Sequence, residues 1–308
     1  MKIKYYPVLI FVFNRPKLFL NLLKPIKKNI NYNRHKYYFF CDVPKKSLFN
    51  FETNKTKKNI RYINDFRCKK KIIIVRKNNY GLAKNVISGV SSVLKNNEAC
   101  IVLEDDLVLH EDCLNFINFG LNKFKNDKKI GSISGYSYIN DYNLSKNQNW
   151  FKLYRHCSWS WGTWRRAWNN FNWDYSKLSF KSLNFQYSHK KYLKAGNDIP
   201  QLLDAQINKL VNSWAVRFNF NCLEKGLLSI SPIYSLTKND GFGIDATHNI
   251  NFLNKKKIIF NELNKINIKF LKKPKLNKKF NEIIKNQHGL NKRLSLRLIV
   301  LKFFNLFF

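Results

Sequence analysis

Four short, mostly apolar runs, each followed by polar residues, dominate the first third of the chain. They cover residues 7–13, 36–41, 71–75 and 99–103. Such runs are typical of strands buried on both faces of a parallel sheet. Residues 17–28 and 83–94 have helical spacing, although Pro25 favours an early end to the first of these helices. This alternation predicts an α/β fold, with a mostly parallel, Rossmann-like sheet flanked by helices.

Polar side chains follow each predicted strand. In a doubly wound sheet the carboxyl ends of the parallel strands meet at one edge, and ligands bind there. The candidate residues at this edge are Asn14, Arg15, Asp42, Asn79 and Gly81, together with the consecutive acids Glu104, Asp105 and Asp106, called the acid triplet below. Asp42 would also suit a turn, and Gly81 would suit a turn or the start of a helix. The convergence of four polar groups predicts a ligand site.

The acid triplet stands out in a chain that has 19 Asp and Glu among 308 residues. Three adjacent carboxylates repel one another, so a cation or several hydrogen-bond donors must offset their charge. A hard divalent metal ion suits such oxygen ligands and leaves positions open for phosphate oxygens and water. A solvated loop or the first turn of a helix would also accommodate the acids. We expect a metal site here.

The chain is strongly basic, with 56 Lys and Arg and a formal charge of +37. Hydrophobic residues make up 44% of it and aromatic residues 16%, which is enough for a core, so the charge does not imply disorder. A surface of this charge attracts polyanions such as nucleic acid, anionic lipid or a substrate that carries a diphosphate. Lysine dominates, whereas arginine does most nucleic-acid recognition, so we expect no nucleic-acid partner.

The cysteine pattern and the ends of the chain bear on location. The six cysteines form no CxxC pair, which is typical of reduced thiols in a reducing compartment. The N-terminus lacks a signal-peptide pattern, and no run reaches the ~18 apolar residues of a membrane span. We therefore expect a cytoplasmic protein. Residues 293–308 are apolar with basic residues, which suits either peripheral binding to an anionic membrane surface or a final helix docked on the core.

The second half of the chain differs from the first in that it has a segment rich in tryptophan. Residues 157–168 contain four of the seven tryptophans. Helices are expected over 177–193 and 199–214, and a strand over 226–233. A Gly-rich loop then runs through residues 239–248.

The acid triplet with its flanks, residues 79–83, and the strand that leads to Asn14 and Arg15 resemble nucleotide-sugar glycosyltransferases of GT-A fold. Within that group the chain is most similar to the inverting N-acetylglucosaminyltransferase I type and to bacterial relatives that build surface polysaccharide. The resemblance covers about residues 7–250. It implies a nucleotide-sugar-binding half (1–130) and an aromatic-rich, acceptor-binding and catalytic half (131–252), followed by a basic C-terminal extension (253–308).

The resemblance implies roles for the donor side of the site. Asp106 would bind Mn²⁺ (or Mg²⁺), which would bridge the two phosphates of the nucleotide. Glu104 and Asp105 would face the ribose and the water shell of the metal. Asp42 would meet the nucleobase. The remaining donor-side residues would line the same part of the site: Asn14, Arg15, Asn79 and Gly81.

The resemblance also implies roles for the acceptor side. Trp161 and Gly162 would face donor sugar and acceptor, because indole rings stack on sugars and glycine admits a close approach. Asp204 would be the general base, with Asp198 as its rival. In the family an acidic pair between two tryptophans is usual at this place. In this chain Leu203 precedes Asp204 and Ala205 follows it. His248 would touch the metal or the diphosphate.

The activity that these expectations describe is a metal-dependent inverting transfer of a hexosyl or N-acetylhexosaminyl group. The donor would be a nucleotide sugar, with UDP favoured by resemblance, and the acceptor a glycan or lipid-linked glycan in surface polysaccharide synthesis. Two alternatives are a basic nucleic-acid-binding protein without catalysis and a sugar-nucleotidyltransferase. The latter would be expected to have a Gly-rich phosphate loop after the first strand, where this chain has Asn14-Arg15-Pro16.

Overall fold

The computed structural model describes residues 3–29, 31–45, 49–139, 150–174, 191–241, 274–290, 292 and 295–298. His248 and most of the Gly-rich loop lie outside the described residues. So do residues 177–190 of the helix expected over 177–193, and residues 293–294 and 299–308 of the tail.

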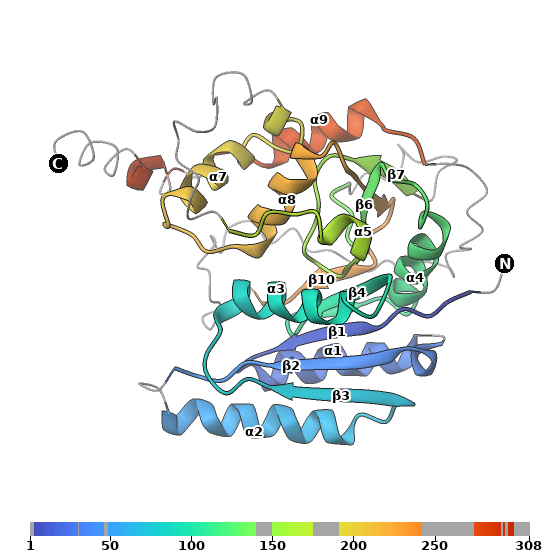
Figure 1. Cartoon of the computed structure of the whole chain (residues 1–308), viewed down its shortest axis with the longest axis vertical. Coiled ribbons are helices and arrows are strands. Elements are labelled where there is room, and N and C mark those ends of the chain that lie inside the picture. The colour runs from blue at the N-terminus through green and yellow to red at the C-terminus, as the bar shows by residue number, and fades with distance from the viewer. Residues whose placement is uncertain are drawn as a thin grey trace.

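An eight-stranded sheet runs through the molecule in the order β3-β2-β1-β4-β8-β6-β9-β7 (Figure 1). Its strands are β1 (Val8–Val12), β2 (Lys36–Cys41), β3 (Lys70–Val75), β4 (Ala99–Glu104), β6 (Ile130–Ser134), β7 (Trp150–Leu153), β8 (Trp161–Trp164) and β9 (Leu228–Pro232). The first four are parallel, as is the β6–β9 pair, whereas β8 runs antiparallel to both β4 and β6 and β7 runs antiparallel to β9. The predicted α/β fold with a mostly parallel sheet is confirmed.

Helices cover both faces of this sheet (Figure 1). One face packs against α1 (Pro16–Lys28), α2 (Phe49–Asp65) and α4 (Cys113–Lys123). The other packs against α3 (Gly81–Leu94), α5 (Arg165–Trp168) and α8 (Trp214–Glu224). In β1, residues 8, 10 and 12 belong to the first core and residues 9 and 11 to the second, as expected of a strand buried on both faces.

Two helices differ from expectation. α1 continues past Pro25 to Lys28, because the buried Leu22, Leu23 and Ile26 hold its last turns on the core. The helix expected over 199–214 ends at residue 207 as α7 (Ile199–Ile207), and α8, which was not expected, begins only at Trp214. Between them Lys209 has a positive φ of 59°, and Ser213 caps α8 by accepting a hydrogen bond from the backbone N–H of residue 216.

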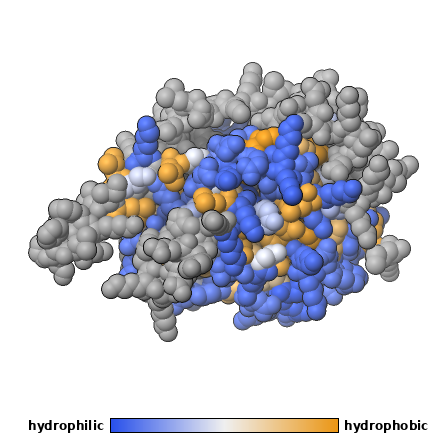
Figure 2. All heavy atoms as spheres, turned by 90° about the horizontal axis from the view of Figure 1, so that it is seen from above, coloured by the Kyte–Doolittle hydropathy of each residue, from blue (hydrophilic) through white to orange (hydrophobic). Residues whose placement is uncertain are grey.

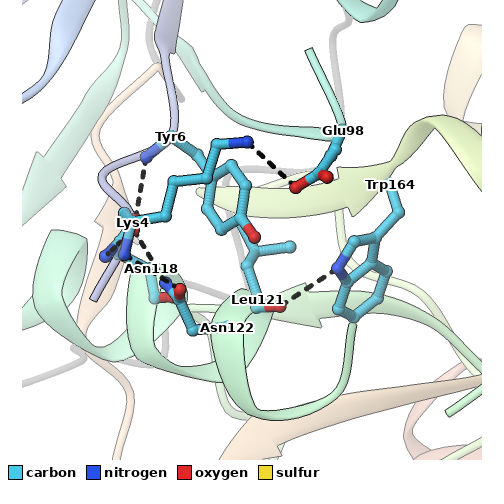
Figure 3. Close-up of polar contacts among 7 residues, drawn as sticks. All are labelled: Lys4, Tyr6, Glu98, Asn118, Leu121, Asn122 and Trp164. Atoms are coloured by element: carbon cyan, nitrogen blue, oxygen red, sulfur yellow. Dashed lines mark hydrogen bonds and ion pairs between the residues drawn. The ribbon is translucent and has the colours of Figure 1, made fainter. Parts of the chain in front are cut away.

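The amino-terminal edge of the sheet is held by side-chain hydrogen bonds (Figure 3). Asn118 and Asn122 of α4 donate to the backbone carbonyl of Lys4, over 3.1 and 2.8 Å. The indole N–H of Trp164 donates to the carbonyl of Leu121 in the same helix, over 3.1 Å. α4 is thereby tied to the segment that precedes β1 and to β8, at the edge opposite to the acid triplet.

The described part of the C-terminal extension packs on the second half of the chain. In α9 (Lys278–Gln287), Phe280 and Ile284 are buried, and the Phe280 ring meets that of Phe151 at 4.8 Å. Farther on, Leu298 packs beside Ala205 of α7. No helix in the described ranges has both the length and the apolar character that a membrane crossing requires.

Candidate functional site

The acid triplet lies where β4 ends, at the carboxyl edge of the parallel strands. Glu104 is the last residue of β4 and pairs in register with Phe11 of β1, so the end of β1 lies alongside. A two-stranded antiparallel ladder of β5 (Leu107–Leu109) and β10 (Thr237–Asn239) follows the triplet, and it pairs Asn239 with Leu107. This ladder brings the start of the Gly-rich loop to the acid triplet.

Arg15 joins the acid triplet by two ion pairs. Its Nη2 lies 2.6 Å from Oδ1 of Asp105, and its Nη1 lies 3.0 Å from Oδ2 of Asp106. The backbone N–H of Phe13 donates to the other Asp105 oxygen over 2.9 Å. The predicted convergence of Arg15 with the acids is therefore present, and the guanidinium supplies charge that the sequence reasoning assigned to a metal.

Asp106 keeps one carboxylate oxygen unused. Its Oδ1 is buried and has no hydrogen-bond partner among the described residues. The side chain as a whole is 10% exposed. The backbone carbonyl of Asp106 accepts from the N–H of Asp240 over 2.9 Å. A Cβ built on Gly241 would overlap Oδ2 of Asp106, so glycine permits this close approach.

The donor set suits a hard divalent ion. Carboxylates are the preferred ligands of Mn²⁺ and Mg²⁺, and a buried carboxylate oxygen without a partner is a position that a cation would satisfy. Within the described ranges, no three His, Cys, Asp or Glu side chains come together as a ready metal site. A metal ion at Asp106 stays a prediction, and within the described ranges its remaining ligands would be oxygens from the substrate or from water.

Burial raises the pKa of Glu104, and repulsion by Asp106 adds to the effect. The pKa of Asp105 is also raised by burial, although the positive charge of Arg15 opposes the shift. The indole N–H of Trp214 donates to Glu104 and favours its charged form. Nothing in the sequence pattern indicated Trp214, because it belongs to a helix more than a hundred residues away.

Trp161 and Gly162 correct the sequence prediction for the acceptor side. Trp161 is 1% exposed, and its ring stacks against the indole of Trp214 at 4.9 Å and that of Trp168 at 6.0 Å. A Cβ on Gly162 would overlap side chains of α4. Both residues thus belong to the core, where neither can stack on a sugar. Trp161 instead supports the tryptophan that contacts Glu104.

Asp42, Asn79 and Gly81 are brought together as predicted, and the side chains of Asp42 and Asn79 form hydrogen bonds with backbone groups nearby. The Asp42 carboxylate accepts from the N–H groups of Tyr80 and Gly81, each over 2.9 Å. Asn79 donates to the carbonyl of Val43. Gly81 begins α3 with a positive φ of 68°, which glycine adopts without strain. These contacts join the end of β2 to the start of α3, and a contact of Asp42 with a nucleobase stays a prediction.

Arg76 is a further cation at this edge that the sequence reasoning missed. It directly follows β3, and its guanidinium lies 4.6 Å from the centre of the Tyr80 ring. Its Nε donates to Asn85 of α3 over 2.8 Å. The signal was available, because a basic residue directly after a strand occupies the same edge as Arg15 and Asp42.

The two candidate bases lie on or beside α7. Asp204 is buried within that helix. Asp198 precedes it and forms two hydrogen bonds with the guanidinium of Arg155, over 2.8 and 3.0 Å. Asp198 is thus committed to an ion pair, which favours Asp204 over its rival, although the role of Asp204 as a base stays a prediction.

Comparison with solved structures gives matches that include three distant ones. No protein-family model matches the chain, and no curated protein matches it. A mannosyltransferase from Pyrobaculum calidifontis in complex with GDP-Man and Mn²⁺ is 11% identical, with a TM-score of 0.40, over 72% of this chain and 69% of its own. GalNAc-T7 with UDP, GalNAc and Mn²⁺ is 11% identical with a TM-score of 0.44, over 76% of this chain and 43% of its own. S. aureus TarS is 11% identical with a TM-score of 0.38, over 74% of this chain and 35% of its own.

Proposed function

We propose that the chain is a metal-dependent glycosyltransferase that moves a sugar from a nucleotide-sugar donor, UDP-linked by resemblance, with inversion at the anomeric carbon. The observation that carries this proposal is the buried Oδ1 of Asp106, which has no hydrogen-bond partner among the described residues. It lies at the carboxyl edge of the sheet, where ligands of such folds bind. Arg15 adds a positive charge beside it, as a diphosphate-bearing substrate requires.

Each part of the site has a role in this reaction. The acceptor hydroxyl oxygen attacks the anomeric carbon while the bond from that carbon to the diphosphate oxygen breaks, and Asp204 takes the hydroxyl proton. A divalent ion on Asp106, when bound, supplies positive charge to the departing diphosphate. Arg15 contributes a further charge at the same place. His248, at the end of the loop that starts against Asp106, would be a second metal ligand.

The nucleotide would lie along the ends of β1, β2 and β3. Asn14 follows β1, and Asn79 and Gly81 form the turn before α3. Asp42 holds that turn, so its contribution to nucleotide binding includes shaping the backbone that the base or ribose meets. The proposed acceptor is a glycan or lipid-linked glycan.

The proposed metal dependence has a direct test. Purified protein is screened by thermal shift against UDP- and GDP-sugars, with Mn²⁺ or with EDTA. We expect a sugar-nucleotide shift that needs Mn²⁺ and disappears in Asp106→Asn. The matched control is Asp65→Asn, an exposed acid at the end of α2. A donor-dependent shift that survives in Asp106→Asn would refute the proposed site.

The C-terminal segment offers a surface for an anionic membrane. Besides one exposed acid, Glu282, the exposed side chains of its described part include basic residues and leucines: Lys275, Leu276, Lys278, Lys279, Leu290, Lys292, Leu296 and Arg297. Figure 2 shows the molecule from the side on which α9 lies in Figure 1, where hydrophobic groups lie among hydrophilic ones. Mixed basic and apolar surfaces of this kind bind anionic headgroups. Peripheral attachment there would bring the chain to a lipid-linked acceptor.

A further inference from the structure

The pairing of Arg15 with two acids of the triplet differs from an ordinary structural ion pair. Buried salt bridges are stable when the remaining lone pairs of the carboxylates are also satisfied. Asp105 meets this condition, because Arg15 holds one oxygen and the N–H of Phe13 holds the other. Asp106 does not, because Oδ1 is buried without a hydrogen-bond partner in the described part of the chain. Both carboxylate oxygens of Asp105 therefore have partners, whereas one oxygen of Asp106 has none in the described part of the chain.

The local charge also indicates that Arg15 alone does not neutralise the acid triplet. The triplet carries up to three negative charges, and one guanidinium offsets one of them. The side chains of Arg15 and Asp106 are 18% and 10% exposed, so water screens this cluster only weakly.

From this geometry we infer that Arg15 is the resident counter-cation of the acid triplet, and that it competes with a divalent cation for Asp106. The inference rests on the metal site of the proposed function. An ion bound at Oδ1 would be separated from the guanidinium by the width of a single carboxylate group, and the two positive charges would repel each other. Binding of the ion therefore requires the Nη1–Oδ2 pair to open.

Arg15 need not leave the site when this pair opens. Its Nη2 remains bonded to Asp105, which is itself held by Phe13. Nη1 then becomes available to an oxygen of an anionic ligand. In the metal-free protein Arg15 offsets one of the negative charges of the acid triplet, and entry of the ion breaks one of the two hydrogen bonds that Arg15 makes with the triplet.

The test measures Mn²⁺ binding directly, by titration followed through the electron paramagnetic resonance of the free ion, without any reaction. Arg15→Gln removes the charge and keeps a polar side chain. We expect it to bind Mn²⁺ at least about tenfold more tightly than the wild type, as loss of a repulsion between close, poorly screened charges predicts. Arg15→Lys keeps a single point charge that cannot bridge two carboxylates, so its affinity should lie between the two. Arg76→Gln, at the same edge but paired with Asn85, should bind like the wild type.

Thermal unfolding supplies a second measurement. In EDTA, Arg15→Gln should melt below the wild type because it leaves two buried acids without their cation. Mn²⁺ should restore most of this loss and raise the melting temperature of the variant more than that of the wild type. If Arg15→Gln proves too unstable to purify, Arg15→Lys carries the comparison.

The outcomes separate the inference from the proposed function. Mn²⁺ binding by the wild type, with equal or weaker binding by both Arg15 variants, overturns the competition and leaves the metal site standing. Absence of Mn²⁺ binding in the wild type and in both variants, with or without a nucleotide sugar, overturns the metal site and the inference with it. Tighter binding by Arg15→Gln, together with thermal rescue, supports both.

Discussion

At the scale of single residues, Gly241 leaves the space that the Asp106 carboxylate occupies. A Cβ there would overlap Oδ2 of Asp106 and would also meet Oδ1 of Asn239 at 2.9 Å. Gly241 also donates its backbone N–H to that Asn239 oxygen over 2.6 Å. A side chain at residue 241 must therefore displace either the Asp106 carboxylate or the turn that Asn239 and Gly241 form.

We predict that Gly241→Ala weakens the Mn²⁺-dependent response to nucleotide sugar while the protein stays folded. Overpacking of this kind costs about 1–3 kcal/mol of stability. Thermal shift with and without Mn²⁺ measures the first effect, and urea unfolding measures the second. Gly289→Ala is the control, because no atom lies within 4 Å of a Cβ built there. An unchanged Mn²⁺ response in Gly241→Ala would show that the 239–241 turn does not shape the site.

At the scale of elements, the Asp42 carboxylate accepts two of the hydrogen bonds that join the end of β2 to the start of α3. Asp42 accepts hydrogen bonds from the first two N–H groups around the start of α3, and its own N–H donates to the carbonyl of Val12 over 2.9 Å. Acidic groups are stabilising at the N-terminus of a helix, where free N–H groups and the helix dipole favour negative charge.

Asp42→Ala should therefore destabilise the protein by about 1–3 kcal/mol, since it leaves two partly buried N–H groups without an acceptor. Asp42→Asn keeps one oxygen acceptor and should lose less. Urea unfolding of the wild type, Asp42→Ala and Asp42→Asn gives the order of their free energies of unfolding. If Asp42→Ala is as stable as the wild type but fails to bind nucleotide, the residue serves the ligand and not the turn.

At the scale of the whole molecule, buried neutral histidines make stability depend on pH. His156 is 3% exposed and lies beside Ser132 and Asn219, and burial lowers its pKa to about 3. Burial lowers the pKa of His35 as well, and that of His288 to about 4. The folded protein thus holds these rings neutral at pH values where the unfolded chain binds protons.

The sign follows from this difference in proton binding. Above a pH of about 6.5 both states are neutral at these rings, and below it only the unfolded state gains protons, so stability falls as the pH decreases toward the folded pKa values. We expect the free energy of unfolding to decrease between pH 7 and pH 4.5, and to decrease less in His156→Gln. Denaturant unfolding at several pH values measures this, and equal slopes for both proteins would contradict it.

The basic C-terminal face is also a property of the whole molecule. We expect Lys278→Glu with Lys279→Glu to weaken binding to vesicles of phosphatidylcholine and anionic phosphatidylglycerol by roughly tenfold or more, since each lysine near such a surface contributes about 1 kcal/mol. Lys57→Glu with Lys58→Glu, exposed on α2, makes the same charge change elsewhere. Co-sedimentation compares the two. Equal losses would mean that net charge, and not the α9 face, attracts the membrane.

The sequence by itself was sufficient for the first four strands and for the edge at which Arg15 and the acid triplet meet. These features depend on short-range patterns, because a buried strand shows itself in a few consecutive residues and the polar residue that ends it is adjacent in the chain. Tertiary structure alone decided that Trp161 lies in the core, that Trp214 contacts Glu104, and that Gly241 lies against Asp106. Each of these depends on which distant segments pack together, and packing is set by the three-dimensional fit of surfaces that no local pattern encodes.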